Sequence, residues 1–490
     1  MPAGMYPATP ATYAAPTCLQ QQKQKEATVM ALDYLVMAIY VLLMASLGWW
    51  GMRKVKNQDD FLVAGRRLGP ALYLGTLSAV MLGGASTIGS VRLGYSYGIS
   101  GLWLVFMLGL GIIVLSLVFS RQIAQLRVFT VTQILEQRYQ ASSRLIGGCV
   151  MVAYDLMVAV TATIAIGSIT EVVFEIPRIT AILCGGGLVI FYSVIGGMWS
   201  LTLTDIIQFV IMTLGIFGVL LPMSLGQAGG LEALQANLPA GFFELGNIGL
   251  DTILTYFLLY FFGALIGQDI WQRLFTARSE SVVRYAGLGA GIYCMFYGAA
   301  CALVGAAAKL LLPDLAVAEN AFAEVTRSVL PAGLRGLVVA AALAAIMSTA
   351  SACLLASATV LKEDIYSRFL TRGGENHLAS SRWITLGLGA AMLLMACLVN
   401  DVIAGLSIAY NLLVGGLLVP IMGALLWRRA SARGAIACML TGSLTVIAFM
   451  VRDGILANTP IYYGLGVSLL TFVGVSLTSR AAPALRSAAE

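Results

Sequence analysis

Apolar residues occur in long runs along nearly the whole chain, and short segments rich in polar and charged residues separate these runs. A helix needs about 20 apolar residues to cross the hydrocarbon core of a bilayer. Most of the runs reach that length. The pattern predicts an all-α polytopic membrane protein with about thirteen transmembrane helices, at residues 31–51, 71–97, 100–120, 146–172, 179–196, 200–224, 250–275, 282–311, 335–360, 383–399, 402–427, 434–451 and 460–478.

The composition excludes a water-soluble globule, because 59% of the 490 residues are hydrophobic and only 11% are charged. Soluble domains are closer to half apolar and a quarter charged. The net charge of +6 has a topological explanation, since Lys and Arg concentrate in every second loop, beginning with the loop that holds Arg53 and Arg67. By the positive-inside rule these loops face the cytoplasm of a cell (inner) membrane. The N-terminus is then outside and the C-terminus in the cytoplasm, and a nucleic-acid partner is not expected.

Small residues interrupt two of the predicted helices, at Leu82 to Thr87 in the second and at Gly263 to Gln268 in the seventh. Secondary transporters built from inverted repeats carry broken helices at corresponding positions of their two halves, and the freed carbonyls bind cations near the bilayer midplane. Glycine also serves as a simple packing residue in membrane helices. The matching offsets favour a transporter, with the packing interpretation left open.

Three motifs carry a resemblance to a known family. The segment GGMWSLTLTDIIQ at 196–208 is the most specific, and FLVAGRRLG at 61–69 and AIMSTAS at 345–351 support it. With these motifs the chain resembles the sodium:solute symporters, which include sodium-coupled sugar, proline, sialic acid and choline carriers.

The resemblance implies a LeuT-like five-plus-five inverted repeat within one transporter domain, residues 29–480. That domain divides into a leading helix at 31–51, a first repeat at 71–224, a second repeat at 250–427 and two trailing helices at 434–478. Residues 1–28, rich in Ala, Pro, Thr and Gln, predict a disordered tail rather than a cleaved signal peptide. Residues 481–490 form a cytoplasmic tail.

The resemblance also implies a sodium site between the first broken helix and the helix at 335–360. Its predicted ligands are the carbonyls of Ala85, Ile88 and Ala345 and the hydroxyls of Ser348 and Thr349. Such oxygens suit a desolvated Na⁺. The alternative is that the two hydroxyls bond back to carbonyls one turn earlier in their own helix.

Some relatives hold a second sodium ion with the signature aspartate and two further hydroxyls. Here Asp205 and Ser351 are present, but position 352 is Ala. One Na⁺ per cycle is therefore expected, and we interpret Asp205, Gln208 and Ser351 as a hydrogen-bond and ion-release network.

Ionisable residues within spans are candidate functional groups because their burial is costly. Arg92 could hold a carboxylate and Asp155 an amine or guanidinium, which together favour an amino-acid-like or guanidino-acid zwitterion. Alternatively, each belongs to a separate structural or gating ion pair. The polar candidates for the cavity are Ser86, Thr87, Thr161, Gln268 and Tyr410.

The predicted function is sodium-coupled import of a small organic solute by alternating access, by a monomer in the lipid bilayer. Proton coupling through Asp155 or Asp205 is the closest alternative. A membrane enzyme is a remote one, since the only histidine, His377, lies in a polar loop, the eight cysteines have no paired spacing, and no phosphate-binding glycine loop occurs. Na⁺ is the only ion or cofactor expected.

Overall fold

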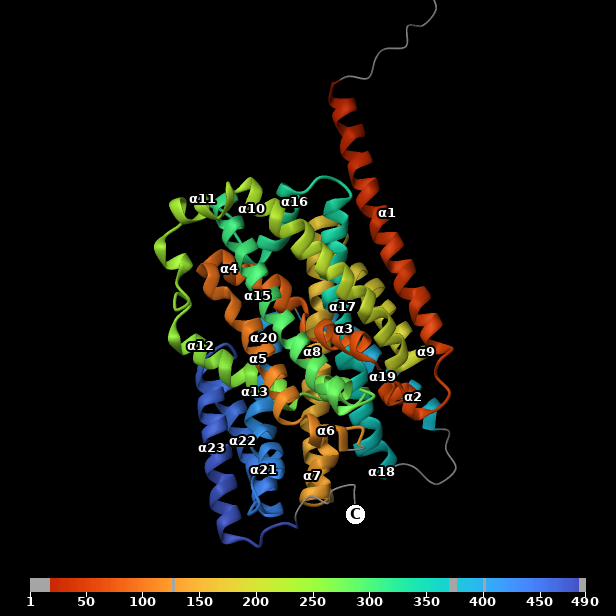
Figure 1. The fold of residues 1–490 in the computed structure, drawn as a ribbon, viewed down its shortest axis with the longest axis vertical. Helices are drawn as coiled ribbons and strands as arrows, with labels where there is room; N and C mark the ends of the chain where they lie inside the picture. The colour runs from red at the N-terminus through yellow and green to blue at the C-terminus, as the bar shows by residue number, and fades with distance from the viewer. Residues whose placement is uncertain (1–17, 126–127, 370–376, 400–401, 484–490) are drawn as a thin grey trace, which may run out of the picture.

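The computed structural model describes residues 18–125, 128–369, 377–399 and 402–483, and this part of the chain is almost entirely helical (Figure 1). Helix α1 begins at Cys18, so residues 18–28 are helical where the sequence predicts a disordered tail. Their Gln, Lys, Glu and Ala residues are good helix formers. The rest of that predicted tail and residues 484–490 of the C-terminal tail lie outside the described residues.

The elements of the first half are α1 (Cys18–Met52), α2 (Gln58–Val63), η1 (Ala64–Arg66), α3 (Pro70–Met81), η2 (Ala85–Gly89), α4 (Ser90–Tyr97), η3 (Gly98–Leu102), α5 (Trp103–Val118), α6 (Ser120–Gln125), α7 (Thr132–Arg138), α8 (Ala141–Phe174), α9 (Arg178–Thr213), η4 (Leu214–Leu220), α10 (Leu221–Gln227), α11 (Gly230–Asn237) and η5 (Ala240–Phe243). Those of the second half are α12 (Leu250–Tyr256), η6 (Phe257–Phe261), α13 (Phe262–Ile266), α14 (Gln268–Leu274), η7 (Val282–Ala286), α15 (Gly287–Leu311), η8 (Ala318–Asn320), α16 (Ala321–Val329), α17 (Leu334–Val360), η9 (Leu361–Tyr366), α18 (Ser367–Phe369), α19 (His377–Leu398), α20 (Val402–Leu413), η10 (Val414–Leu418), α21 (Val419–Leu426), α22 (Ala432–Asp453) and α23 (Thr459–Thr478).

Ten helical stretches of the described chain are long and apolar enough to cross a membrane, and a bent pair, Leu250–Ile266 with Gln268–Leu274, makes eleven. Two of these stretches, Ala85–Val118 and Arg178–Gln227, each contain a reversal at a glycine with positive φ. Dividing both gives thirteen passages, the number that the apolar runs predict.

Gly98 reverses the chain between α4 and α5. Its φ of 67° is a conformation that residues with a Cβ rarely adopt. Helix α15 packs against both helices. Thr87 bonds Tyr297, and Lys309 lies over the ring of Tyr95, so α4 runs parallel to α15. Helix α5 packs along α15 in the opposite direction.

Gly197 makes the second reversal, within α9, with φ 48° and ψ −136°. Beyond it, Ser200 donates to the carbonyl of Gly48 in α1, and Gln208 donates to the hydroxyl of Tyr40. The arm after Gly197 therefore runs antiparallel to α1. The signature segment of the sequence thus forms the turn and the first part of this arm.

The two broken helices meet at one end of the molecule. Helix α3 ends at Met81, and Leu82 has the non-helical angles φ −97° and ψ 60°. Gly267, with ψ 130°, separates α13 from α14, which are bent by 43°. An isolated parallel bridge joins Leu68, just before α3, to Ala277, just after α14. The segment that leads into the first broken helix therefore lies beside the segment that leaves the second.

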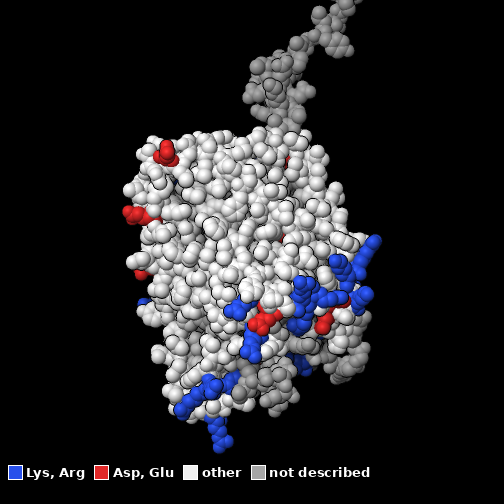
Figure 2. Space-filling view, viewed as in Figure 1, with Lys and Arg blue, Asp and Glu red and all other residues white. Residues whose placement is uncertain are grey.

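Basic side chains are concentrated at one end of the molecule. Figure 2 shows Lys and Arg side chains gathered at the lower end, opposite the start of α1. At this end the buried carboxylate of Asp364 accepts hydrogen bonds from Thr130 and Arg144, at 2.9 and 2.7 Å. Glu136 pairs with Arg144 and Arg368. Partial burial acts to raise the pKa of Glu136, but the two arginines lower it below its usual value. These pairs tie α7 and α8 to the end of α17.

Candidate functional site

Two adjacent hydroxyls of α17 face the end of α3. Ser348 donates to the carbonyl of Ala79 at 2.8 Å and to that of Ala345 at 2.9 Å. Thr349 donates to the carbonyl of Val80 at 2.9 Å and to that of Ala345 at 3.3 Å. The back-bonding expected of Ser and Thr in a helix is therefore present, but each hydroxyl also reaches across to the broken helix.

The glycines of the break allow this close approach. A Cβ at Gly83 would lie 2.7 Å from the hydroxyl oxygen of Thr349, so a larger residue there would push the two helices apart. Within the described chain, no hydrogen bond reaches the carbonyl of Leu82, because the helix ends there. The carbonyls of Ala79, Val80 and Ala345 and the two hydroxyls thus gather at one buried point, and the carbonyl of Leu82 follows two residues after Val80.

Two of the five predicted sodium ligands make no contact with the hydroxyls of α17 in the structure. Ala85 and Ile88 lie past the break, in η2, and the hydroxyls of Ser348 and Thr349 make no hydrogen bond to them. The physical reason is that α3 ends at Met81, so the carbonyls of its last turn are not followed by a further helical turn and can accept from the hydroxyls of α17. Ala79 and Val80, rather than Ala85 and Ile88, accept these hydrogen bonds.

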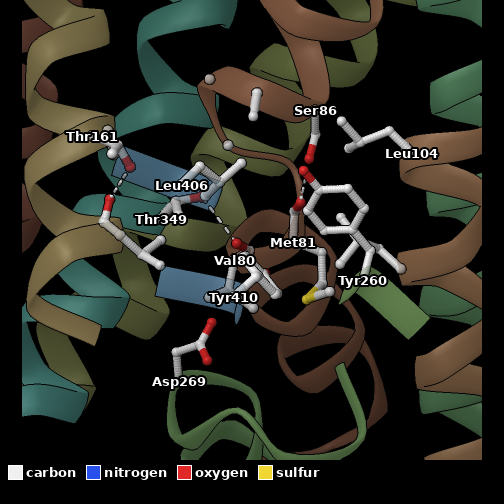
Figure 3. A pocket seen from close by; sticks show the side chains of 16 residues that line it. Val80, Met81, Ser86, Leu104, Thr161, Tyr260, Asp269, Thr349, Leu406 and Tyr410 are labelled. Carbon is white, nitrogen blue, oxygen red and sulfur yellow. Dashed lines mark hydrogen bonds between the residues drawn. The ribbon is translucent and has the colours of Figure 1, made fainter. Parts of the chain in front are cut away.

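A pocket adjoins this point and encloses about 560 Å³ of space free of atoms, its open mouth included. Apolar side chains and the backbone of the break form most of its wall. The polar side chains that line it are Ser86, Thr161, Tyr260, Asp269, Thr349 and Tyr410 (Figure 3). Because Thr349 both lines the pocket and bonds the carbonyl of Val80, the pocket and the oxygen cluster share a wall.

Asp269 is a lining residue that the sequence analysis missed. It is the second residue of α14, directly after the break at Gly267. Figure 3 shows its carboxylate pointing from that break towards Val80 and Tyr410. The sequence feature that could have identified Asp269 is an acidic residue two positions after a glycine in the middle of a predicted membrane helix. The broken helix delivers this carboxylate to the pocket because its backbone turns there.

Three buried acids surround one buried arginine behind the pocket. Arg273 lies 3.5 Å from Asp205, and both side chains are fully buried. Asp205 also accepts a hydrogen bond from Thr76. Asp155 and Asp269 lie within electrostatic range of the same arginine, and neither oxygen of Asp155 has a hydrogen-bond partner among the described residues. The region carries more acidic than basic groups.

The structure brings some of the predicted solute-binding residues to the pocket and places others elsewhere. Ser86, Thr161 and Tyr410 line it. Thr87 instead bonds Tyr297, and Gln268 bonds the backbone at 129–131, where both are buried in helix contacts. Asp155 lies behind the pocket wall.

Arg92 lies away from the pocket. Its guanidinium pairs with Glu319 at 3.1 Å, and the two side chains are 31% and 53% exposed. The structure therefore supports the alternative interpretation of Arg92, a separate surface ion pair. The residue sits one turn past the break, where α4 already turns its side chain towards η8.

Two residues of the predicted network, Gln208 and Ser351, are buried and hydrogen-bonded near the signature segment, whereas Asp205 bonds Thr76 and pairs with Arg273 instead. Gln208 donates to the hydroxyl of Tyr40, Tyr192 donates to the carbonyl of Met347, and Ser351 donates back to the carbonyl of Ser348. These bonds join α1 and both arms of α9 to α17, the helix that carries the two hydroxyls.

Comparison with known proteins identifies the family. A profile described as the sodium:solute symporter family matches residues 61–442, which is more than half of the chain. The chain belongs to this family. The matched range includes both broken helices and all of α17.

Two curated proteins resemble this symporter-family chain over most of its length. A sodium/pantothenate symporter of Escherichia coli (strain K12) is 28% identical, over 90% of this chain and 95% of its own. A sodium/glucose cotransporter of Vibrio parahaemolyticus is 26% identical, over 83% of this chain and 82% of its own.

A solved structure of a sodium-coupled sialic acid symporter, in a substrate-bound outward-open state, superposes with a TM-score of 0.80. It covers 92% of this chain and 99% of its own at 18% identity. This likeness confirms the LeuT-like fold predicted from the sequence.

The position of Arg92 gives a testable prediction for this family member. The pair of Arg92 with Glu319 is exposed, and exposed pairs contribute about 0–1 kcal/mol. Arg92→Gln should therefore leave the thermal midpoint nearly unchanged and change the apparent affinity for the transported solute by no more than about twofold. The measurement is a thermal scan in NaCl and a transport assay beside wild type. Abolished uptake with normal folding would restore Arg92 as a solute ligand.

Proposed function

We propose that this protein is a sodium-coupled symporter that imports a small organic solute by alternating access. The observation that carries the proposal is the pair of hydroxyls, Ser348 and Thr349, set against the carbonyls at the end of the first broken helix. Membership of the sodium:solute symporter family supports it.

The donor set suits sodium. Its proposed ligands are the carbonyls of Ala79, Leu82 and Ala345 and the hydroxyls of Ser348 and Thr349. The carbonyl of Val80 is not among them, because a hydroxyl that binds Na⁺ through its oxygen can still donate its hydrogen, and Thr349 donates to Val80. The proposed ligands are all hard, uncharged oxygens, which can replace the hydration shell of a monovalent cation without a buried negative charge. In the structure each hydroxyl donates to carbonyls, so the oxygens that would bind Na⁺ are already gathered.

The site links ion binding to the transport cycle. Its oxygens come from α3 and α17, so it is complete only while these helices are packed together. Na⁺ therefore stabilises the arrangements that keep them together, and a ligand shifts a conformational equilibrium only by such differential affinity. Thr349 belongs to both the ion site and the pocket wall. Sodium binding would thereby fix one wall of the solute site.

We propose one sodium ion per cycle. The carboxylate of Asp205 is already engaged by Arg273 and Thr76, and position 352 is Ala, so the second ion site of some relatives lacks its ligands here. Entry of one charge into a cytoplasm at negative potential releases about 2.3 kcal/mol per 100 mV, which can concentrate the solute. This assumes that the basic end of the molecule faces the cytoplasm.

Proton coupling is the second candidate. The observation in its favour is Asp155, a fully buried acid whose two oxygens have no hydrogen-bond partner among the described residues. A proton would remove the cost of burying that charge.

A screen of the purified protein in NaCl against KCl, between about pH 5.5 and pH 8.5, separates the two candidates. We expect Na⁺ alone, without solute, to raise the thermal midpoint with an apparent affinity that varies little with pH, because the proposed ligands do not titrate in this range. KCl replaces NaCl because an organic cation could itself enter the pocket. Stabilisation that is equal in both salts but changes with pH would support the proton-coupled candidate and reject the sodium site.

A further inference from the structure

We propose that the solute carries a positively charged nitrogen, which the carboxylate of Asp269 binds beside the rings of Tyr260 and Tyr410. This inference rests on the proposed function, since it takes the pocket beside the sodium site as the solute site. It assigns that site a chemical class of ligand: small amines and quaternary ammonium compounds.

Charge is the first argument. Among the described residues that line the pocket, Asp269 is the one with a charged side chain. No Lys or Arg of the described chain lines it, and Arg92 is paired elsewhere. An anionic solute would therefore meet an acid and no basic side chain. A cationic nitrogen would instead form a charge-assisted contact, which is roughly twice as strong as a neutral hydrogen bond.

The surroundings strengthen this argument. Asp155, Asp205 and Asp269 lie around one buried base, Arg273, which forms an ion pair with Asp205. A buried charge without a partner is costly, whether it sits in a membrane or in a protein core. A cation bound at Asp269 would supply the missing positive charge.

The aromatic rings are arranged for a cation. Tyr260 and Tyr410 both line the pocket, with ring centroids 5.1 Å apart and an interplanar angle of 69°. Tyr154 meets Tyr410 edge-to-face at 5.4 Å and lies 3.4 Å from Asp269 through its hydroxyl, a distance too long for a strong bond. Ring faces that meet at steep angles form the sides of a partial cage. Such cages attract ammonium groups through the ring quadrupoles.

The remaining wall suits the carbon groups attached to such a nitrogen. Leu104, Leu108, Val158 and Leu406 line the pocket and offer contacts to methyl or methylene groups. Carboxylate, rings and aliphatic wall together match a small organic cation.

The test uses the purified full chain and matched probes in NaCl. Choline is compared with 3,3-dimethylbutan-1-ol, its neutral carbon analogue, and ethanolamine is compared with propan-1-ol; glucose and lactate represent neutral and anionic solutes. We expect the cationic probes to raise the thermal midpoint of wild type and the neutral analogues to leave it unchanged.

Asp269→Asn should lower the affinity for the cationic probes by about tenfold or more, because it removes a charge-assisted contact. Asp269→Glu keeps the charge and should retain part of the response. Asp453→Asn is the control, since Asp453 lies at the end of α22, far along the chain from the pocket helices. Stabilisation by NaCl alone should persist in Asp269→Asn, which reports that the variant folds and that the sodium site is intact.

Two outcomes would overturn the inference. One is an undiminished response of Asp269→Asn to the cationic probes. The other is a wild-type protein that responds to NaCl and to glucose or lactate, but to no cationic probe. If NaCl failed to stabilise the wild-type protein, the proposed sodium site would be rejected instead. Failure of the sodium site and failure of the cation inference are therefore distinguishable.

Discussion

Replacing Ser348 or Thr349 with alanine should lower the apparent sodium affinity by about tenfold or more while leaving the protein folded. Each hydroxyl is one of five proposed ligands, and the loss of one such oxygen is comparable to the loss of a hydrogen bond to a charged group, about 1.5–3 kcal/mol. The fold tolerates the change because both side chains are small and lie in an Ala-rich helix. The measurement is the thermal midpoint as a function of NaCl concentration at constant ionic strength.

Thr385→Ala is the matched control. Thr385 is also a buried threonine in a membrane helix, but its hydroxyl bonds only a carbonyl one turn earlier, that of Ser381. Its sodium response should equal that of wild type. If Ser348→Ala and Thr349→Ala both kept wild-type sodium affinity, these residues would have to be removed from the ion site.

Arg273→Gln should cause the largest loss of folded protein. The substitution leaves Asp205 without its charged partner and leaves Asp155 and Asp269 without the nearest positive charge. Breaking a buried pair by removing one partner costs about 3–5 kcal/mol. The measurement is the yield of monodisperse protein in detergent together with its thermal midpoint.

A double substitution identifies the cause of that loss. Arg273→Gln combined with Asp205→Asn restores charge balance between the two sites and should recover part of the stability, because neither side chain then buries an unpaired charge. Arg278→Gln is the control, an exposed arginine just beyond α14. A wild-type yield for Arg273→Gln alone would mean that the acids are neutral in the folded protein and do not need the arginine.

The arrangement suggests why ion and solute sites adjoin. The first broken helix ends at Met81, and its free carbonyls meet Ser348 and Thr349, while the second break delivers Asp269 to the same pocket. The sodium oxygens are neutral and the pocket acid is charged. Na⁺ and an organic cation would thus use different chemistry a short distance apart, without competing for one ligand.

Some features of this protein follow from the sequence alone. The lengths of the apolar runs determined the all-α membrane class and the thirteen passages, because a bilayer of fixed thickness imposes a fixed helix length. The glycines at 83–84 and 267 located both breaks, since they weaken a helix wherever they are placed. The motifs at 61–69, 196–208 and 345–351 identified the family, and with it the LeuT-like fold.

The tertiary structure decided which atoms meet. Whether Ala79 and Val80 or Ala85 and Ile88 face the hydroxyls of α17 depends on where the helix stops within a short glycine-containing segment. The hydrophobic pattern of the sequence does not determine that point. Likewise, Arg92 and Asp269 are both charged residues just past a break in the sequence. In the folded protein Arg92 pairs with Glu319, whereas Asp269 lines the pocket. Tertiary packing decides this difference, because the direction of a side chain depends on how its half-helix is rotated against the neighbouring helices.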